Sequence, residues 1–325
     1  MPTTLTRRDR LGGLRVRWGI RRFSYTVDPG LYAVGHPDDR SPVLVTANYK
    51  LTFDSLRKEL AIRDAWVLAL DTRGINVWCA AGKGTFGTDE AVRRIEAAQL
   101  SQVVSHAVVV LPQLGAPGVS APDVKRRSGF RVVWGPVRAA DLPAFLDAGM
   151  RATDEMRRVR FPLRDRLVLA PVEIMGAAKI ALAIVAAAAI VGGVGPGIFS
   201  LPRAWAAAWP AAAAVAAALV AGAVVTPALL PWVPGRMFAL KGAEVGAIAA
   251  AVLLVPLASA FPALRLAASA IFMVAATSFI AMNYTGTSTF TSLSGVKKEM
   301  RAALPWQVGS AALAAALWIA GGFVR

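Results

Sequence analysis

Cysteine and histidine are almost absent from this chain. Cys79 is the only cysteine, and His36 and His106 are the only histidines, among 325 residues. A single thiol excludes an intramolecular disulfide, a cysteine-rich zinc site and an iron–sulfur cluster, since a cluster needs about four thiolates. If the chemistry of the protein needs electrons, a partner has to supply them.

Charged residues are scarce in the second half of the chain. Residues 1–169 hold 27 Lys and Arg against 17 Asp and Glu, a net charge of +10, whereas residues 170–325 hold 9 against 3, a net charge of +6. The mean hydropathy of +0.51, with 56% hydrophobic residues, excludes an ordinary soluble protein. The sequence therefore predicts a basic soluble half followed by a membrane domain.

Five charge-free stretches in residues 170–325 each contain the roughly 20 apolar residues that a membrane-spanning helix requires. They are residues 180–202, 204–235, 245–264, 266–296 and 302–324. The loops after the second and fourth stretches hold Arg236, Lys241, Lys297, Lys298 and Arg301, whereas the alternate loops hold only Arg203 and Arg265. The positive-inside rule then predicts a multi-pass protein of the cytoplasmic membrane, with the N-terminal domain in the cytoplasm and Arg325 outside.

The N-terminal segment is rich in arginine. The first 22 residues contain seven arginines and no apolar run, so no secretory signal is visible. Together with the Pro and Gly residues that follow, this composition indicates a loosely ordered basic arm over residues 1–41. The net charge of +16 favours attraction to anionic lipid headgroups over nucleic acid, because no aromatic-interleaved basic stripe is present.

Residues 42–169 alternate short apolar runs with helical stretches. The expected strands are Val43–Thr46, Ala65–Leu70, Val103-Val104 with Val108–Leu111, and Phe130–Trp134. The expected helices between and after them are Phe53–Leu60, Thr88–Ala98, Pro122–Ser128 and Ala139–Ala148. This alternation predicts βαβ units and a mainly parallel, Rossmann-like sheet, whose ligands bind outside the carboxyl ends of the strands.

Cys79 lies in the stretch Asn76-Val77-Trp78-Cys79-Ala80-Ala81-Gly82-Lys83-Gly84-Thr85. This stretch is not a P-loop, because Val77 and Gly84 occupy positions where that motif needs Gly and Ser or Thr. Neither histidine is spaced to act as a base for Cys79, and His106 is better explained as a structural residue. The residues alone leave two interpretations open: a buried structural cysteine, or a thiolate whose pKa is lowered by a helix N-terminus and Lys83.

The stretch from Asn76 to Lys83 resembles the cap-helix motif of the corrinoid protein of the mercury-methylation pair (the HgcA family), which is related to the corrinoid domain of corrinoid/iron–sulfur proteins. The similarity continues through residues 46–50, 112–118 and 125–130 and into the hydrophobic second half, but it is missing from about the first 25 residues. It implies that a corrinoid, a cobalamin in its base-off form, is held between cap helix and sheet with Cys79 as lower axial ligand of cobalt. The implied cofactor contacts are Thr46, Asn48, Asn76, Val77, Trp78, Cys79, Ala80, Ala81, Gly82, Lys83, Gln113, Leu114, Gly115 and Gly135.

The same resemblance implies a function. We expect a basic arm (1–41), a cytoplasmic corrinoid-binding domain (42–169) and a transmembrane domain of five helices (170–325). The enzyme would be a corrinoid-dependent methyltransferase that transfers a methyl group to Hg(II). Its partners would be an upstream methyl donor protein and a ferredoxin-like protein (HgcB-like) with two 4Fe–4S clusters that returns cobalt to Co(I). Two alternatives stay open: a membrane-anchored corrinoid carrier for another acceptor, and a non-catalytic membrane-bound corrinoid or redox-binding module.

Overall fold

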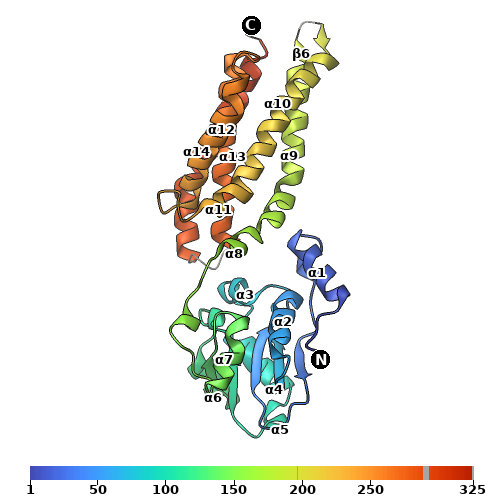
Figure 1. Cartoon of the computed structure of the whole chain (residues 1–325), viewed down its shortest axis with the longest axis vertical. Coiled ribbons are helices and arrows are strands. Elements are labelled where there is room, and N and C mark those ends of the chain that lie inside the picture. The colour runs from blue at the N-terminus through green and yellow to red at the C-terminus, as the bar shows by residue number, and fades with distance from the viewer. Residues whose placement is uncertain (196, 288–292, 324–325) are drawn as a thin grey trace. The chain divides into compact units, whose positions relative to one another are not determined.

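The computed structural model describes residues 1–195, 197–287 and 293–323, and the chain divides into two compact units, Met1–Arg160 and Phe161–Arg325 (Figure 1). Residues 288–292, part of the expected fourth span, lie outside the described residues, as does Arg325.

A five-stranded sheet forms the centre of the first unit. Its strands are β1 (Gly30–Val34), β2 (Val43–Ala47), β3 (Ala65–Leu70), β4 (Val108–Leu111) and β5 (Arg131–Trp134), in the order β1-β3-β2-β4-β5. β2 to β5 run parallel, and β1 is antiparallel to β3 at the edge. The predicted α/β fold with a mainly parallel sheet is confirmed.

Helices cover both faces of this sheet. They are α2 (Lys50–Arg57), α3 (Val77–Lys83), α4 (Thr88–Ala97), α5 (Leu100–Val103), α6 (Ala121–Ser128) and α7 (Leu142–Asp147). Neighbouring strand residues point to opposite faces, so Val45 packs with α3, α4 and α6 in one apolar cluster, while Leu44 packs with α2 and α7 in another. From β2 the chain goes to β3, which lies on one side of β2 in the sheet. It then crosses to β4 on the other side of β2, so the winding direction reverses between β2 and β4.

Two details differ from the sequence-based expectation. Residues 1–41 contain an ordered helix, α1 (Arg7–Arg17), and strand β1, whereas we expected a loosely ordered arm. β1 forms because the exposed edge of β3 offers hydrogen-bonding partners from Ala65 to Ala69. Val103 is the last residue of the short helix α5 and does not belong to a strand. The first residue of this helix, Leu100, is fully buried, so the helical turn packs against the core.

The second unit consists of helices. They are α8 (Leu163–Leu167), α9 (Ala170–Gly193), α10 (Leu201–Val220), a π-helical turn (Ala221–Val225), α11 (Thr226–Leu229), α12 (Phe238–Leu254), α13 (Ala263–Thr287) and α14 (Leu293–Ala320). Five helical stretches are long and apolar enough to cross a membrane: Leu163–Gly193, Leu201–Leu229, Phe238–Leu257, Ala263–Thr285 and Ser294–Ala320. The number agrees with the prediction, but the helices continue through the charges that bounded the predicted stretches. A small hairpin of β6 (Val194–Gly195) and β7 (Ile198–Phe199) joins α9 to α10.

Glycines let α12 and α13 approach each other closely. A Cβ atom on Gly246 would lie 2.9 Å from the Cβ of Thr277, and one on Gly242 would lie 2.5 Å from the Cβ of Ala281. Gly242 and Gly246 are four residues apart and therefore share one helix face. This spacing of small residues is typical of closely packed membrane helices.

Polar side chains of the second unit donate hydrogen bonds to backbone carbonyls where helices are interrupted or end. The Tyr284 hydroxyl donates a hydrogen bond to the carbonyl of Ala223 at 2.7 Å, inside the π-helical turn. Arg166 donates to the carbonyls of Pro227 and Ala228, and Lys241 donates to that of Leu230 at 2.6 Å. Lys241, which we expected in the loop after the second span, lies within α12 and is buried, because its ammonium group satisfies carbonyls that follow α11.

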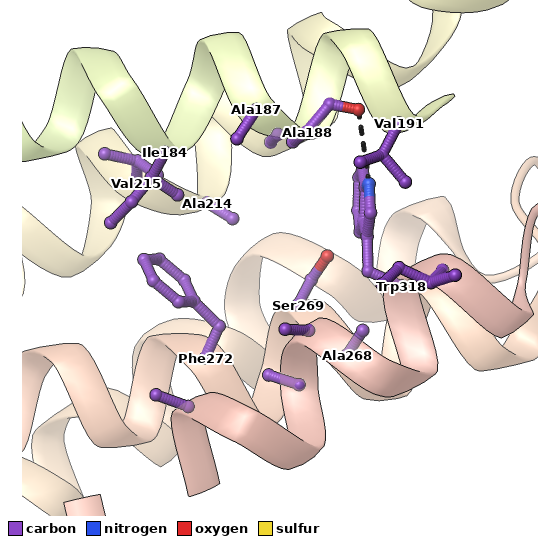
Figure 2. Close-up of a pocket in the computed structure, with 15 residues that line it drawn as sticks. Ile184, Ala187, Ala188, Val191, Ala214, Val215, Ala268, Ser269, Phe272 and Trp318 are labelled. Atoms are coloured by element: carbon purple, nitrogen blue, oxygen red, sulfur yellow. Dashed lines mark hydrogen bonds between the residues drawn. The ribbon is translucent and has the colours of Figure 1, made fainter. Parts of the chain in front are cut away.

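Residues of α9, α10, α13 and α14 line an open apolar pocket of about 320 Å³ (Figure 2). Eight of its fifteen lining residues are alanines, whose small side chains leave the space open. At one end the indole N–H of Trp318 donates to the carbonyl of Ala188 at 3.3 Å, which ties α14 to α9.

Candidate functional site

The helix that carries Cys79 is delimited by local sequence signals. Asn76 precedes the helix, and its side-chain oxygen accepts the backbone N–H of Cys79 at 2.9 Å. Gly84 ends α3 in a left-handed conformation with φ of 79°, which glycine adopts without strain. The motif therefore folds as the expected short helix, with Cys79 at its third position.

The loop before α3 is held by a residue from the neighbouring strand. Asn48 follows β2, and its side-chain oxygen accepts the backbone N–H groups of Thr72 at 3.0 Å and Gly74 at 3.2 Å. The Thr72 hydroxyl lies 2.9 Å from the same oxygen and 2.6 Å from the carbonyl oxygen of Ile75. Thr72 was not among the contacts predicted from the sequence, although a polar residue within two positions of the end of a buried strand is a signal for such a role.

α3 lies over the point where the winding of the sheet reverses. It packs against β2 and against the 3-10 turn Gln113–Gly115 that follows β4. Ala81 approaches this loop closely, because a Cβ atom on Gly118 would come within 2.9 Å of the Ala81 Cα. Ligands of open α/β sheets bind at this kind of reversal, outside the carboxyl ends of the strands.

The two sides of α3 have different surroundings. Val77, Ala80 and Ala81 are buried in the apolar cluster of the sheet. Trp78 and Cys79 are partly exposed and Gly82 and Lys83 are exposed, as expected for positions on the opposite side of a helix with 3.6 residues per turn. We expected the two alanines to let a flat cofactor approach, but their small size instead allows close packing within the protein.

Burial raises the pKa of the Cys79 thiol above its ordinary value. Lys83, the Asn76 side chain and Arg22 act in the opposite direction but do not outweigh burial. The expected lowering of this pKa by the helix terminus and Lys83 is therefore wrong, because that expectation left out the desolvation of the thiolate. A metal ion that binds the sulfur has to displace its proton.

Arg22 belongs to this neighbourhood although it is far from Cys79 in the sequence. The same arginine acts electrostatically on Cys79 and on the buried Tyr49, whose pKa is raised by burial. No sequence motif connects these residues, and only the fold brings the N-terminal segment to the carboxyl edge of the sheet. Arg22 is thus a positive charge that sequence analysis did not include in the site.

Most of the predicted contact residues lie at or near the carboxyl ends of the parallel strands. Thr46 is buried in β2, and Leu114 is partly buried against the same apolar cluster as α3. The side-chain oxygen of Gln113 accepts a hydrogen bond from Arg157 at 2.7 Å. Gly115 packs on the Phe86 ring, where a Cβ atom would lie 2.5 Å from a ring carbon. Gly135 follows β5, one strand beyond β4, and its part in a cofactor site stays a prediction, as do the other contacts.

Cys79 stands alone as a metal donor. Among the described residues, no three His, Cys, Asp or Glu side chains gather in a group that could hold a metal ion. His106 has a structural contact instead, since its Nε2 lies 3.0 Å from the carbonyl oxygen of Ser41. A metal bound at Cys79 would therefore need most of its donors from a ligand that carries it.

The similarity of this chain to known proteins lies in the first unit. Residues 21–146 match the family described as CO dehydrogenase/acetyl-CoA synthase delta subunit. The chain is 40% identical over 124 residues to the acetyl-CoA decarbonylase/synthase complex subunit gamma of Methanopyrus kandleri, which covers 37% of this chain and 26% of the relative. It is 35% identical over 130 residues to the subunit gamma 2 of Methanosarcina thermophila, which covers 39% of this chain and 27% of the relative.

These matches are confined to the α/β unit. The chain spans about a quarter of the length of these curated relatives, so their complete activities do not carry over to it. Their names refer to acetyl-CoA decarbonylase/synthase complexes and not to mercury. The N-terminal unit is thus a domain similar to part of the gamma subunits of these complexes, joined here to a unit with five long apolar helices.

Proposed function

We propose that the first unit binds a corrinoid on the side of α3 that carries Cys79, and not between α3 and the sheet as the resemblance implied, because Ala80 and Ala81 already pack there. Cys79 would be the lower ligand of cobalt, and the protein would transfer a methyl group from the corrinoid to Hg(II). One observation carries the proposal. A single thiol, partly exposed on a short helix, lies over the reversal point of a parallel sheet. The relation to corrinoid/iron–sulfur proteins that the sequence motif implied is supported by the match to acetyl-CoA decarbonylase/synthase subunits.

The residues at the site fit such a cofactor. When bound, a corrinoid would supply a cobalt that carries a methyl group together with most of that metal's ligands, so that one donor from the protein would suffice. Cys79 is one such donor, and the described residues show no additional cluster that would compete for a metal ion. Trp78 offers a partly exposed aromatic side chain beside Cys79, and the exposed Gly82 has no side chain to obstruct a flat ligand.

The protein's own task at this site is to present the Cys79 sulfur to a bound metal and to let it lose its proton when the metal binds. Burial raises the pKa of the Cys79 thiol and so favours its protonated form. Lys83 and Arg22 favour the thiolate and ease its formation when a metal takes the place of the proton. A thiolate donates more charge to a metal than imidazole does, which favours release of a methyl group to an electrophilic acceptor such as Hg(II).

Reducing power comes from outside this chain under the proposal. With Cys79 as the only thiol, the chain holds no iron–sulfur cluster of its own. We therefore propose a ferredoxin-like partner with two 4Fe–4S clusters as the electron donor, and a separate methyl donor protein upstream. The soluble unit works on the cytoplasmic side, held at the membrane by the five helices.

A second candidate function is a corrinoid methyl carrier for an acceptor other than mercury. The observation that favours it is the set of relatives, which are named for acetyl-CoA decarbonylase/synthase complexes. The two candidates share the cofactor and the ligand role of Cys79. They differ only in the acceptor, so an assay for methylmercury separates them.

The test is reconstitution of the full-length detergent-solubilised protein with hydroxocobalamin, followed by absorption and paramagnetic-resonance spectra. We expect the cobalt bands of Cys79→Ala to differ from those of the wild type before any mercury is added, and methylmercury formation to be lost. Cys79→His should keep part of the activity, because imidazole can ligate cobalt. Ser55→Ala, a change on α2, is the matched control and should behave as the wild type.

Each outcome selects one function. Identical cobalt spectra in wild type and Cys79→Ala, both folded and loaded, would disprove the ligand role and leave Cys79 as a docking point for Hg(II). A coloured wild-type protein that forms no methylmercury points to the second candidate. A wild-type protein that stays colourless would leave only a non-catalytic binding module.

A further inference from the structure

The N-terminal helix and the turn after it expose large apolar side chains. Leu11, Leu14, Trp18, Ile20 and Phe23 are 45–71% exposed to solvent. Only Met1 and Ile62 are comparably exposed among the large apolar side chains of the first unit, all of whose residues are described. Leu11, Leu14 and Trp18 have helical spacings of three, four and seven residues and therefore form one stripe along α1 and its C-cap residue Trp18.

The opposite side of α1 is fixed to the domain. Gly13 and Val16 are buried, and Asp9 forms ion pairs with Lys50 at 2.6 Å and with Arg57 at 2.9 Å. Gly12 lies directly against Tyr25, since a Cβ atom there would come within 2.7 Å of the ring carbons. α1 therefore cannot turn its apolar stripe inward without breaking these contacts.

Arginines surround the apolar stripe. Arg7, Arg8, Arg10, Arg15, Arg17 and Arg21 are exposed, and Arg22 is partly exposed. The only acidic residue before Asp28 is Asp9, which is directed at the domain and paired there. The outward surface of residues 7–23 thus combines positive charge with exposed hydrocarbon.

This combination of positive charge and exposed hydrocarbon fits an anionic lipid surface better than it fits a nucleic acid. Aliphatic side chains such as Leu11, Leu14 and Ile20 gain free energy only where hydrocarbon replaces water, and a nucleic-acid backbone does not provide hydrocarbon. Arginine side chains can extend along an apolar layer and place their guanidinium groups at phosphates. Amphipathic helices with this pattern lie in the membrane interface and prefer anionic lipids.

We propose that residues 7–23 form a binding site for anionic membrane lipids. Leu11, Leu14 and Trp18 enter the boundary between headgroups and acyl chains, and the arginines bind headgroup phosphates. The site holds the α/β unit to the membrane surface independently of the five long helices. It does not depend on the identity of the cofactor or of the methyl acceptor.

The test compares full-length protein in nanodiscs of phosphatidylcholine alone and of phosphatidylcholine mixed with phosphatidylglycerol, by hydrogen exchange. We expect the amides of residues 7–23 to exchange more slowly in the anionic nanodiscs by about fivefold or more, the factor that a single arginine at an anionic surface gives. Added salt should reduce this difference, because the charges are exposed.

Two variants and a control complete the experiment. Replacing Leu11, Leu14 and Trp18 together by Ser removes the stripe, and replacing Arg8, Arg15 and Arg17 together by Gln removes charge while the stripe remains. Both should abolish the difference between the two nanodiscs, whereas Ile62→Ser, at an 87% exposed position of the same unit, should keep it. Equal exchange of the wild type in both nanodiscs, or a lipid-dependent difference that survives both variants, would overturn the proposal. Slow exchange in both nanodiscs that salt does not change would mean that protein covers this surface, which would overturn it as well.

Discussion

The side-chain oxygen of Asn48 lies 2.9 Å from the hydroxyl of Thr72 and accepts the backbone N–H of the same residue at 3.0 Å. This contact joins the carboxyl ends of β2 and β3 and fixes the loop from which α3 begins. We expected Asn48 to contact a ligand directly. In the structure its side-chain oxygen holds the loop before the helix that carries Cys79, and its contact with a ligand stays a prediction.

Replacing Asn48 by Ala should loosen this loop. The change removes the acceptor of two buried backbone N–H groups and a partner of the Thr72 hydroxyl, so the free energy of opening of residues 71–76 should fall by about 2 kcal/mol. Hydrogen exchange of these amides measures the effect. Gln102→Ala, at an exposed position on α5, is the control and should leave the exchange unchanged. Equal protection in Asn48→Ala and wild type would show that the loop does not depend on this amide.

Alkylation of Cys79 should report its raised pKa. Because the thiolate is the nucleophile, the rate with iodoacetamide should rise with pH through a midpoint above that of an ordinary thiol. Lys83 lowers this pKa, so Lys83→Met should slow alkylation at pH 8 by roughly two- to threefold. Lys58→Met, which changes an exposed lysine on the opposite side of the sheet, is the control. A faster reaction in Lys83→Met would contradict the assignment.

Asp9 should hold α1 on the domain. Burial opposes its ionisation, but hydrogen bonds from Lys50 and Thr6 outweigh burial and hold the pKa of Asp9 well below its usual range. A lowered pKa in the folded state stabilises the protein above the unfolded pKa, and this contribution is lost only as the pH falls through the folded pKa. At pH 7, Asp9→Asn should therefore weaken the docking of α1 by about 2 kcal/mol.

Exchange of the amides of residues 10–17 measures this loss. Asp28→Asn, outside the ion-pair cluster, serves as the control. Faster exchange in both variants would mean that α1 responds to charge in general and not to the contacts of Asp9 with Lys50 and Arg57.

Gly246→Val should disturb the packing of α12 on α13. Its Cβ atom would already lie 3.0 Å from the Cα of Val274, so a larger side chain has to separate the helices at a cost of about 1–3 kcal/mol. The melting temperature of the detergent-solubilised protein should fall. Gly309→Val is the matched control, because no atom lies within 4 Å of a Cβ at that position. An equal fall in both variants would point to helix propensity and not to packing.

The orientation of the five helices can be tested by cysteine labelling in a Cys79→Ser background. Because Arg236, Lys297, Lys298 and Arg301 are expected on the cytoplasmic side, Pro234→Cys should react with an impermeant maleimide only after the cells are permeabilised. Ser259→Cys, at an exposed position between α12 and α13, should react in intact cells. Labelling of both positions on the same side would exclude the five-span arrangement.

The local structure of this protein is determined by its sequence. Apolar runs separated by amphipathic stretches define a mainly parallel α/β sheet, and charge-free stretches of about 20 residues define five long helices. Asn76 and Gly84 likewise delimit α3, because capping and left-handed turns depend on the residue type at one position. These are short-range properties, and a sequence contains all that is needed to predict them.

The environment of each site residue was decided by the tertiary structure. Which side of α3 is buried depends on β2 and on the turn after β4, so Ala80 and Ala81 face the core and Cys79 does not. The direction of the pKa shift of Cys79 follows from burial, which outweighs the nearby charges that the sequence shows. Lys241 is buried because carbonyl groups from another helix accept its charge. Burial and long-range partners arise only when distant segments meet, and for that reason the sequence predicted the elements of this site but not their surroundings.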